Sequence, residues 1–315
     1  MNGTVAITDH GWYQFLLAQD DLDEVNFWTP SAHWGFRGEV GAPFFFKLKA
    51  QYDHAICGFA HFARYSRLPD WLAWETFGAK NGCPTFESMR ERIGAIRDRI
   101  DYRAQSPSNE IGCILLAQPT FFQPDEWVAG PRDWPPANLR HKRYDLTAGE
   151  GLRIWEECLA RTKPRQTNLV ARQPMLVRED SPRYGTPQLV APRLGQGIFR
   201  VAVMDAYGRA CAATQEHSLP ALEASHIQPY AKDGPHEVRN GVLLRADLHR
   251  LFDQGYVTIT PEHRIEVSSR LKEDYRNGRS YYPLHGASVF VPTSAADAPS
   301  PDYLRWHNEQ VYRGA

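Results

Sequence analysis

The sequence lacks the features that mark membrane, secreted or disulfide-stabilised proteins. No apolar run approaches the length that spans a bilayer, because charged residues interrupt each run. The first residues, MNGTVAITDHGWYQF, have neither the basic nor the apolar region of a secretory signal. The five cysteines are scattered and form no C-x-x-C pair, which argues against a disulfide framework and a zinc ribbon. We therefore expect a reduced, cytoplasmic protein with no membrane partner.

The sequence also lacks an overall charge of one sign, since its formal net charge is −1. Residues 1–138 hold 12 Lys and Arg against 17 Asp and Glu, residues 139–200 hold 12 against 6, and residues 201–315 hold 12 against 14. The basic middle stretch suits contacts with nucleic-acid phosphates. A solvated basic connector would have the same composition, so charge alone does not separate the two interpretations.

No segment repeats at a fixed period, and a chain of 315 residues is longer than one typical compact core. Its 42% hydrophobic and 23% charged residues are typical of a folded globular protein. Five prolines between positions 119 and 136 indicate a boundary. We predict an α+β protein with domains at residues 1–138 and 193–315, joined by a basic helical and extended connector at 139–192.

Apolar patterning in the first domain indicates both strands and helices. Residues 44–50 and 55–63 are short, apolar and aromatic-rich, which suits paired strands. Residues 111–117 are predicted to form a buried strand. Apolar side chains recur every three or four positions from Phe86 to Ile100, which predicts a helix with one apolar face.

Two further elements are predicted around the connector. Thr147 and Glu150 have the spacing of a capping box at the start of a helix. The apolar face of this helix would hold Leu152, Trp155 and Leu159. Residues 198–204, IFRVAVM, are predicted to form a strand that ends in a turn at 205–208.

Four polar residues at linked spacings carry the chemical information. His226 is followed by Asn240, His249 and Asp253 at intervals of fourteen, nine and four residues. On a helix, His249 and Asp253 share one face, so an imidazole and a carboxylate can hold one divalent cation. Asn240 precedes a short strand, where its side chain can hold a loop through hydrogen bonds to the backbone. The predicted frame is a strand that ends at 225–226, a loop, a short strand at 242–244 and a helix at 246–253.

This set of side chains suits phosphodiester hydrolysis. A neutral imidazole titrates near the working pH, so His226 can take a proton from the attacking water. A cation held by His249 and Asp253 would stabilise the negative charge that develops on the phosphate and the leaving oxygen. We expect Mg²⁺, with Mn²⁺ and Ni²⁺ as alternatives.

The motifs around these residues resemble those of the HNH endonucleases of the ββα-metal class. A single Cys211 precedes SHIQP at 225–229, NGVLL at 240–244 and LHRLFDQG at 248–255, and the resemblance covers residues 190–290. It implies that His226 is the general base, Asn240 orients the active-site loop and His249 binds the metal. Ser225 is a departure, because many HNH enzymes place a metal-binding Asp or His at this position.

Each of these features has a simpler explanation when it is taken alone. An isolated histidine is usually a surface or core residue, Asn240–Gly241 reads as a turn, and the leucines around His249 read as core. Their conjunction on one strand–loop–strand–helix pattern favours the nuclease. His217, His236, His263 and His285 have no comparable context and are left out. Four arginines in or near the unit are expected to contact DNA: Arg193, Arg200, Arg245 and Arg250.

The first domain is expected to supply targeting, since HNH modules cut with little sequence preference. Its paired strands resemble the PUA-like small barrels, which include the EVE and SRA domains. Proteins that join such a domain to an HNH module resemble modification-dependent restriction enzymes. The resemblance implies a β-barrel with helices whose aromatic side chains grip a flipped base, and our candidates are Trp28, Trp34, Phe36 and Trp71. The alternative is that most of these aromatic residues belong to the core.

We therefore predict a type IV-like restriction endonuclease that cleaves double-stranded DNA, with modified cytosine as the expected signal, in defence against foreign DNA. Double-strand cleavage by one site per chain would favour a homodimer. Two alternatives stay open. A nucleic-acid-binding protein with a decayed nuclease centre would be consistent with Ser225, and an RNA-directed nuclease would be consistent with the RNA binding that is common in PUA-like domains.

Overall fold

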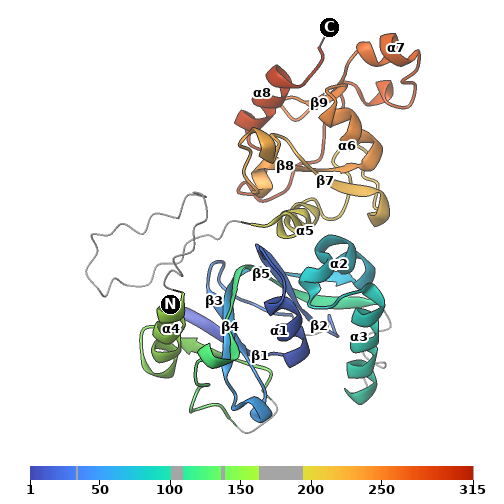
Figure 1. The fold of residues 1–315 in the computed structure, drawn as a ribbon. Helices are drawn as coiled ribbons and strands as arrows, with labels where there is room; N and C mark the ends of the chain where they lie inside the picture. Colours follow the sequence, from blue (N-terminus) through green and yellow to red (C-terminus); the bar gives the residue numbers. More distant parts are fainter. Residues whose placement is uncertain (33–34, 101–108, 136–138, 163–193, 315) are drawn as a thin grey trace, which may run out of the picture. The chain divides into compact units, whose positions relative to one another are not determined.

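The structure is a computed structural model in which residues 33–34, 101–108, 136–138, 163–193 and 315 are not described (Figure 1). The chain folds into two compact units, Met1–Arg193 and Leu194–Ala315. None of the described helices is long and apolar enough to cross a membrane.

The N-terminal unit is built on a mixed six-stranded sheet with the order β2-β5-β4-β3-β1-β6 (Figure 1). Strands β1 and β3 pair in parallel, and the other neighbours pair antiparallel. The strands are β1 (Asn2–Ile7), β2 (Glu24–Thr29), β3 (Pro43–Lys47), β4 (Ile56–Pro69), β5 (Glu110–Phe121) and β6 (His141–Asp145), and the helices are α1 (His10–Leu17), α2 (Asp70–Phe77), α3 (Phe86–Ile100) and α4 (Gly149–Arg161).

The described strands form an open sheet, and the predicted closed barrel is not found among them. Strand β6 adds to β1, so β2 and β6 are left as the two edges. The strands and the helix predicted from apolar patterning are confirmed. Residues 44–50 and 55–63 contribute to the paired strands β3 and β4, residues 111–117 lie in β5, and α3 spans the predicted helix.

A hydrophobic core lies on each face of this sheet. Because side chains alternate along a strand, Phe44 and Phe46 of β3 point to one face and Phe45 points to the other. Helix α1 covers the first face, and helix α4 covers the second with Ile154 and Cys158. Of the predicted aromatic candidates, Phe36 belongs to the first core and packs against Phe44 and Phe62.

The capping box predicted at the start of α4 is wrong. The N-cap residue is Ala148, and the Thr147 hydroxyl donates to Asp145 Oδ1 at 2.7 Å instead of capping the helix. The buried face holds Gly151, Ile154 and Cys158, whereas Leu159 of the predicted face is 41% exposed. The pattern failed because Glu150 is engaged with arginine side chains and the short Asp145 turn already satisfies Thr147.

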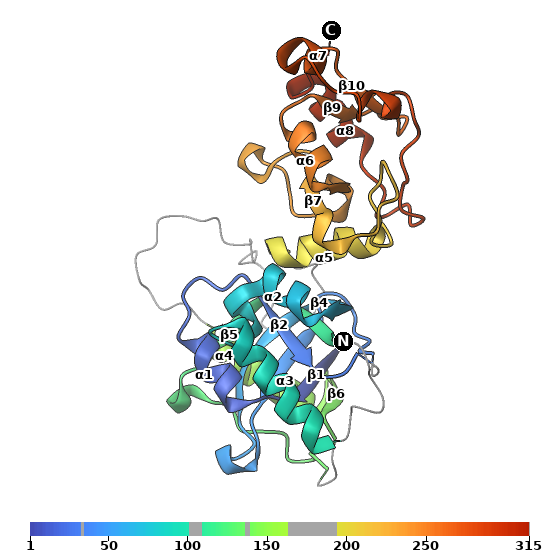
Figure 2. The same cartoon turned by 90° about the vertical axis from the view of Figure 1, so that its right-hand side faces the viewer.

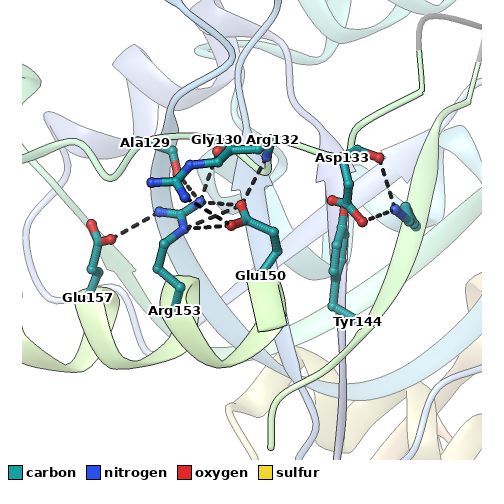
Figure 3. Close-up of polar contacts among 9 residues, drawn as sticks. Ala129, Gly130, Arg132, Asp133, Tyr144, Glu150, Arg153 and Glu157 are labelled. Atoms are coloured by element: carbon teal, nitrogen blue, oxygen red, sulfur yellow. Dashed lines mark hydrogen bonds and ion pairs between the residues drawn. The ribbon is translucent and has the colours of Figure 1, made fainter. Parts of the chain in front are cut away.

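Strand β6 and helix α4 belong to the N-terminal unit, so the predicted boundary at residue 138 needs correction. Figure 3 shows how α4 holds the loop at 129–133. The Arg153 guanidinium donates to the carbonyls of Ala129 and Gly130 at 3.1 and 2.9 Å. Tyr144 of β6 donates to Asp133 Oδ1 at 2.9 Å. Residues 139–161 are thus part of this unit and not a connector, and residues 163–193 lie outside the described part of the chain.

The C-terminal unit places two short antiparallel strand pairs, β7 with β8 and β9 with β10, among helices (Figure 2). Its elements are α5 (Gln196–Ala206), β7 (Leu222–His226), β8 (Gly241–Arg245), α6 (Ala246–Asp253), β9 (Val257–Ile259), β10 (Ile265–Val267), α7 (Arg270–Tyr275) and α8 (Pro301–Gln310). The predicted strand–loop–strand–helix frame is confirmed by β7, β8 and α6.

The strand predicted at residues 198–204 is wrong, because this segment forms helix α5. Seven of the eleven residues of the helix are buried, including Ile198, Phe199, Val201 and Met204, and only Gln196 is exposed. Burial on almost all sides removes the polar positions that reveal a period of 3.6 residues, so a buried helix and a buried strand have the same apolar pattern.

Candidate active site

The paired strands β7 and β8 position His226. His226 is the last residue of β7 and lies opposite Gly241 of β8. Its imidazole stacks on Phe199 of α5, with the ring centroids 3.9 Å apart and the planes at 14°. One face of the imidazole is therefore covered by an apolar ring, and the side chain is only partly exposed.

A second histidine contacts the edge of the His226 ring. His226 Nε2 lies 2.9 Å from His236 Nδ1, and the His236 ring is itself stacked on Tyr230 with centroids 4.7 Å apart. Burial, together with repulsion from His236 and His249, lowers the pKa of His226 to about 4. His226 is therefore neutral near pH 7, which is the form that accepts a proton.

Asn240 closes the loop between the two strands. Its side chain is fully buried, and its Oδ1 accepts from the Gln228 N–H at 2.8 Å. Its Nδ2 donates to the carbonyls of Gln228 and Pro235 at 2.9 and 3.0 Å. Gly234 passes close to this side chain, and a Cβ there would lie 1.9 Å from the Gln228 carbonyl oxygen. The loop has this path because position 234 carries no side chain.

His249 on α6 lies between two carboxylates. Its Nδ1 is 2.7 Å from Glu223 Oε2 of β7, and its Nε2 is 3.3 Å from Asp253 Oδ2 on the same helix. Burial raises the pKa of Asp253, with a further contribution from Glu223, while His249 lowers it. The carboxylate of Asp253 is thus destabilised by its surroundings and would gain from a cation.

His249 and Asp253 together fit a divalent cation whose remaining ligands are water and substrate phosphates. Among the described residues, no three His, Cys, Asp or Glu side chains form a closed metal site. His249 Nε2 and Asp253 are nevertheless close enough to act as neighbouring ligands of one ion. Mg²⁺ characteristically takes one or two protein carboxylates and completes its shell with water and substrate phosphates. Ser225 is not part of this set, because it is fully buried and its hydroxyl faces the His226 carbonyl at 3.4 Å.

The arginines predicted to contact DNA differ in their surroundings. Arg250 is exposed on α6, whereas Arg200 on α5 is partly buried. Arg245 forms an ion pair with Asp247, with Nε 3.0 Å from Oδ1, so its charge is already compensated. Arg193 lies outside the described residues.

The N-terminal unit contains an aromatic cavity of about 800 Å³. Trp28 and Phe36 line this cavity together with Phe27 and Tyr65, and polar groups from Asp9, Thr29, Arg92 and His141 also reach it. Trp28 is fixed by its indole N–H, which donates to the Asn81 carbonyl at 2.9 Å. Trp71 lies on α2 and does not line the cavity, and Trp34 is outside the described residues.

Three residues of the site were missed by the sequence interpretation: Phe199, Glu223 and His236. Phe199 was assigned to a strand, and His236 was set aside because it has no motif context. Glu223 precedes His226 by three residues on the same strand, and a carboxylate so close to a proposed base was a usable signal. The His236 contact depends on the path of the loop, which spacing alone does not give.

Comparisons with known proteins give one family match, which lies within the C-terminal unit. The family described as HNH endonuclease matches residues 211–260. A solved structure described as "Modification dependent TagI restriction endonuclease" is 13% identical and is matched over 98% of this chain and 81% of that chain, with a TM-score of 0.27. No curated protein matches the chain.

Proposed function

We propose that this chain, which carries an HNH endonuclease domain, is a metal-dependent enzyme that hydrolyses DNA phosphodiester bonds. The arrangement of His226 is the observation that supports the proposal. A neutral imidazole is held between Phe199 and His236, and it lies near enough to His249 for that residue to lower its pKa. A partly buried neutral base beside an imidazole that can bind a cation suits phosphodiester hydrolysis.

Each side chain has a role that follows from its contacts. In the tautomer in which His226 Nε2 donates to His236 Nδ1, the Nδ1 atom of His226 is left to take the proton from the attacking water. Glu223 accepts a hydrogen bond from His249 Nδ1 and so leaves the Nε2 lone pair directed toward Asp253. A divalent cation at His249 and Asp253 would supply positive charge for the phosphate and the leaving oxygen. Asn240 fixes the loop that carries His236.

The aromatic cavity supports a proposed reader of modified bases in the N-terminal unit. Trp28, Phe36 and Tyr65 offer ring surfaces, and Asp9 and Arg92 offer groups that can pair with the edge of a base. A flipped base is recognised by this combination of stacking and edge hydrogen bonds. On this basis we propose modified cytosine in double-stranded DNA as the signal, with defence against foreign DNA in the cytoplasm as the role. Cutting of both strands by one site per chain would favour a homodimer.

The test is cleavage of plasmid and phage DNA, unmodified or cytosine-modified, with Mg²⁺, Mn²⁺ or Ni²⁺. His226→Ala should abolish cutting, and His217→Ala, which alters an exposed histidine of the same unit, should leave it unchanged. Wild-type protein that binds DNA without cutting it would make the chain a binding protein with a decayed centre. Cleavage that does not depend on any base modification would contradict the proposed reader of modified bases. Faster cleavage of a matched RNA duplex would show that RNA, not DNA, is the substrate.

A further inference from the structure

A second cavity, of about 630 Å³, adjoins the aromatic one at the carboxyl ends of the parallel strands β1 and β3. Ile7 and Lys49 line both cavities. The aromatic cavity lies on the sheet face covered by α1, whereas Trp134 of the second cavity packs against the core on the α4 face. A ligand that passes over the ends of these two strands would reach both.

The second cavity is basic, although residues 1–138, which supply all of its lining, carry a net negative charge. It is lined by Lys47, Lys49 and Arg132 against one carboxylate, Asp53. Residues 1–138 as a whole hold 12 Lys and Arg against 17 Asp and Glu. Three cations at one cavity are thus a local feature, and they favour an anionic ligand.

Lys47 is the buried cation of this cavity, and burial lowers the pKa of its ammonium. It is fully buried, and its ammonium lies 3.2 Å from the Leu48 carbonyl and 2.9 Å from His54 Nδ1. The same ammonium is 4.5 Å from the centre of the Trp134 ring. Since these partners occupy its hydrogen-bonding directions, Lys47 positions Trp134 and His54. The exposed Lys49 and Arg132 are placed to contact a ligand, and Arg132 Nη1 also lies 4.0 Å from Glu150 Oε1.

The rim that carries Arg132 is held in place by α4 and β6 (Figure 3). The Arg132 N–H donates to Glu150 at 2.9 Å, and the Lys142 ammonium lies 2.6 Å from Asp133 Oδ2. Gly130 passes so close to the next loop that a Cβ would lie 2.2 Å from the His54 carbonyl oxygen. The backbone of the rim is therefore fixed before any ligand arrives, which lowers the entropic cost of binding.

We propose that this basic cavity binds backbone phosphates of the DNA strand whose base enters the aromatic cavity, with Lys49 and Arg132 as the phosphate contacts. The inference rests on the proposed function, because it assumes that the N-terminal unit binds DNA. Phosphate contacts position a nucleic acid and carry no sequence information, so this site would hold the strand in register while the aromatic cavity reads the base.

The experiment measures binding of the full-length protein, in EDTA to prevent cleavage, to a labelled DNA duplex with one 5-methylcytosine and to its unmodified counterpart. Lys49→Ala/Arg132→Ala removes two exposed charges. The matched control, Arg37→Ala/Arg90→Ala, removes two exposed charges that line neither cavity. The first variant should weaken binding about tenfold at low salt and reduce the slope of log K against log salt by about 1.8. The control should stay within about twofold of wild type.

The outcomes separate this inference from the reader proposed above. Equal weakening of both duplexes by Lys49→Ala/Arg132→Ala supports a phosphate site, whereas a change equal to that of the control overturns it. Trp28→Ala should instead alter the ratio of modified to unmodified affinity. If the wild-type protein binds both duplexes equally, the proposed reader of modified bases is contradicted. The change in salt slope caused by Lys49→Ala/Arg132→Ala would still test the phosphate site. Failure of the wild type to bind either duplex would overturn both.

Discussion

His226 Nε2 and His236 Nδ1 lie 2.9 Å apart, so the proposed base is oriented by a second imidazole. One of the two nitrogens must carry the proton and the other must accept it. An imidazole partner orients the ring without the stabilisation of the imidazolium that a carboxylate would give. This difference bears directly on the pH range in which His226 can act.

His236→Ala should shift the acid limb of the cleavage profile to higher pH. His236 is one of the causes that lower the pKa of His226 to about 4, and its loss would also admit water to the ring. As the pKa of the base moves toward its ordinary value, protonation inactivates the enzyme at a higher pH than in wild type. The measurement is cleavage rate against pH, with His217→Ala as the control. An unmoved acid limb would contradict this assignment.

Asn240→Ala should destabilise the C-terminal unit by about 2–4 kcal/mol, because it leaves buried backbone groups of the loop without partners. Three hydrogen bonds to Gln228 and Pro235 are lost together. Asn240→Asp keeps the oxygen that accepts from Gln228 but not the two donated bonds, so its effect tests the donors separately. Urea unfolding monitors the change. A loss below about 0.5 kcal/mol would show that the loop is held by other contacts.

Glu223→Gln should weaken Mn²⁺ binding by about 10- to 100-fold, since a carboxylate that orients a metal-binding imidazole also raises its basicity. Glu223 contacts His249 Nδ1 at 2.7 Å, opposite the nitrogen that faces Asp253. Calorimetric titration of the full chain with Mn²⁺ measures the change, and Glu262→Gln, at an exposed position of the same unit, is the control. Unchanged affinity would leave Glu223 without a role at the metal.

The stability of the C-terminal unit should fall as the pH decreases from 6.5 toward 4. Burial lowers the pKa of His307 from 6.5 to about 4, so the unfolded chain takes up a proton before the folded one does. The contribution of neutral His307 to the free energy of unfolding is fully present above pH 6.5. Its loss as the pH falls to 4 amounts to about 3 kcal/mol. His307 lies between Thr258 and the Phe252 carbonyl, at 2.8 and 3.1 Å.

His307→Gln provides the comparison for this prediction. The variant should be less stable than wild type at pH 7, and its free energy of unfolding should depend less on pH over the same interval. The pKa of His226 is also lowered, so His226 contributes equally to the pH dependence of the free energy of unfolding in both proteins. Parallel curves for the two proteins would show that His307 is not the titrating group.

The sequence predicted the elements whose residues repeat with a visible period and the strand–loop–strand–helix frame of the candidate site, whose motifs are local. Strands β7 and β8 and helix α6 were placed because their polar residues have fixed spacings. Helix α5 was not, because burial on almost every side removes its period. The pairing of β6 with β1 joins residues more than a hundred positions apart, and no local pattern reports such a contact. The same holds for His236, whose partner depends on the fold of the loop.

The stacking of Phe199 on His226 also determines the shortest fragment of this chain that could be fused to another protein with the site intact. The stretch that matches the HNH endonuclease family, residues 211–260, begins after α5 and ends before α8. A graft with those limits would lose the ring beneath the base and, with His307, the side chain stacked on Phe252 of α6. A chimaeric nuclease built from this chain therefore has to extend from Leu194 to the end of α8.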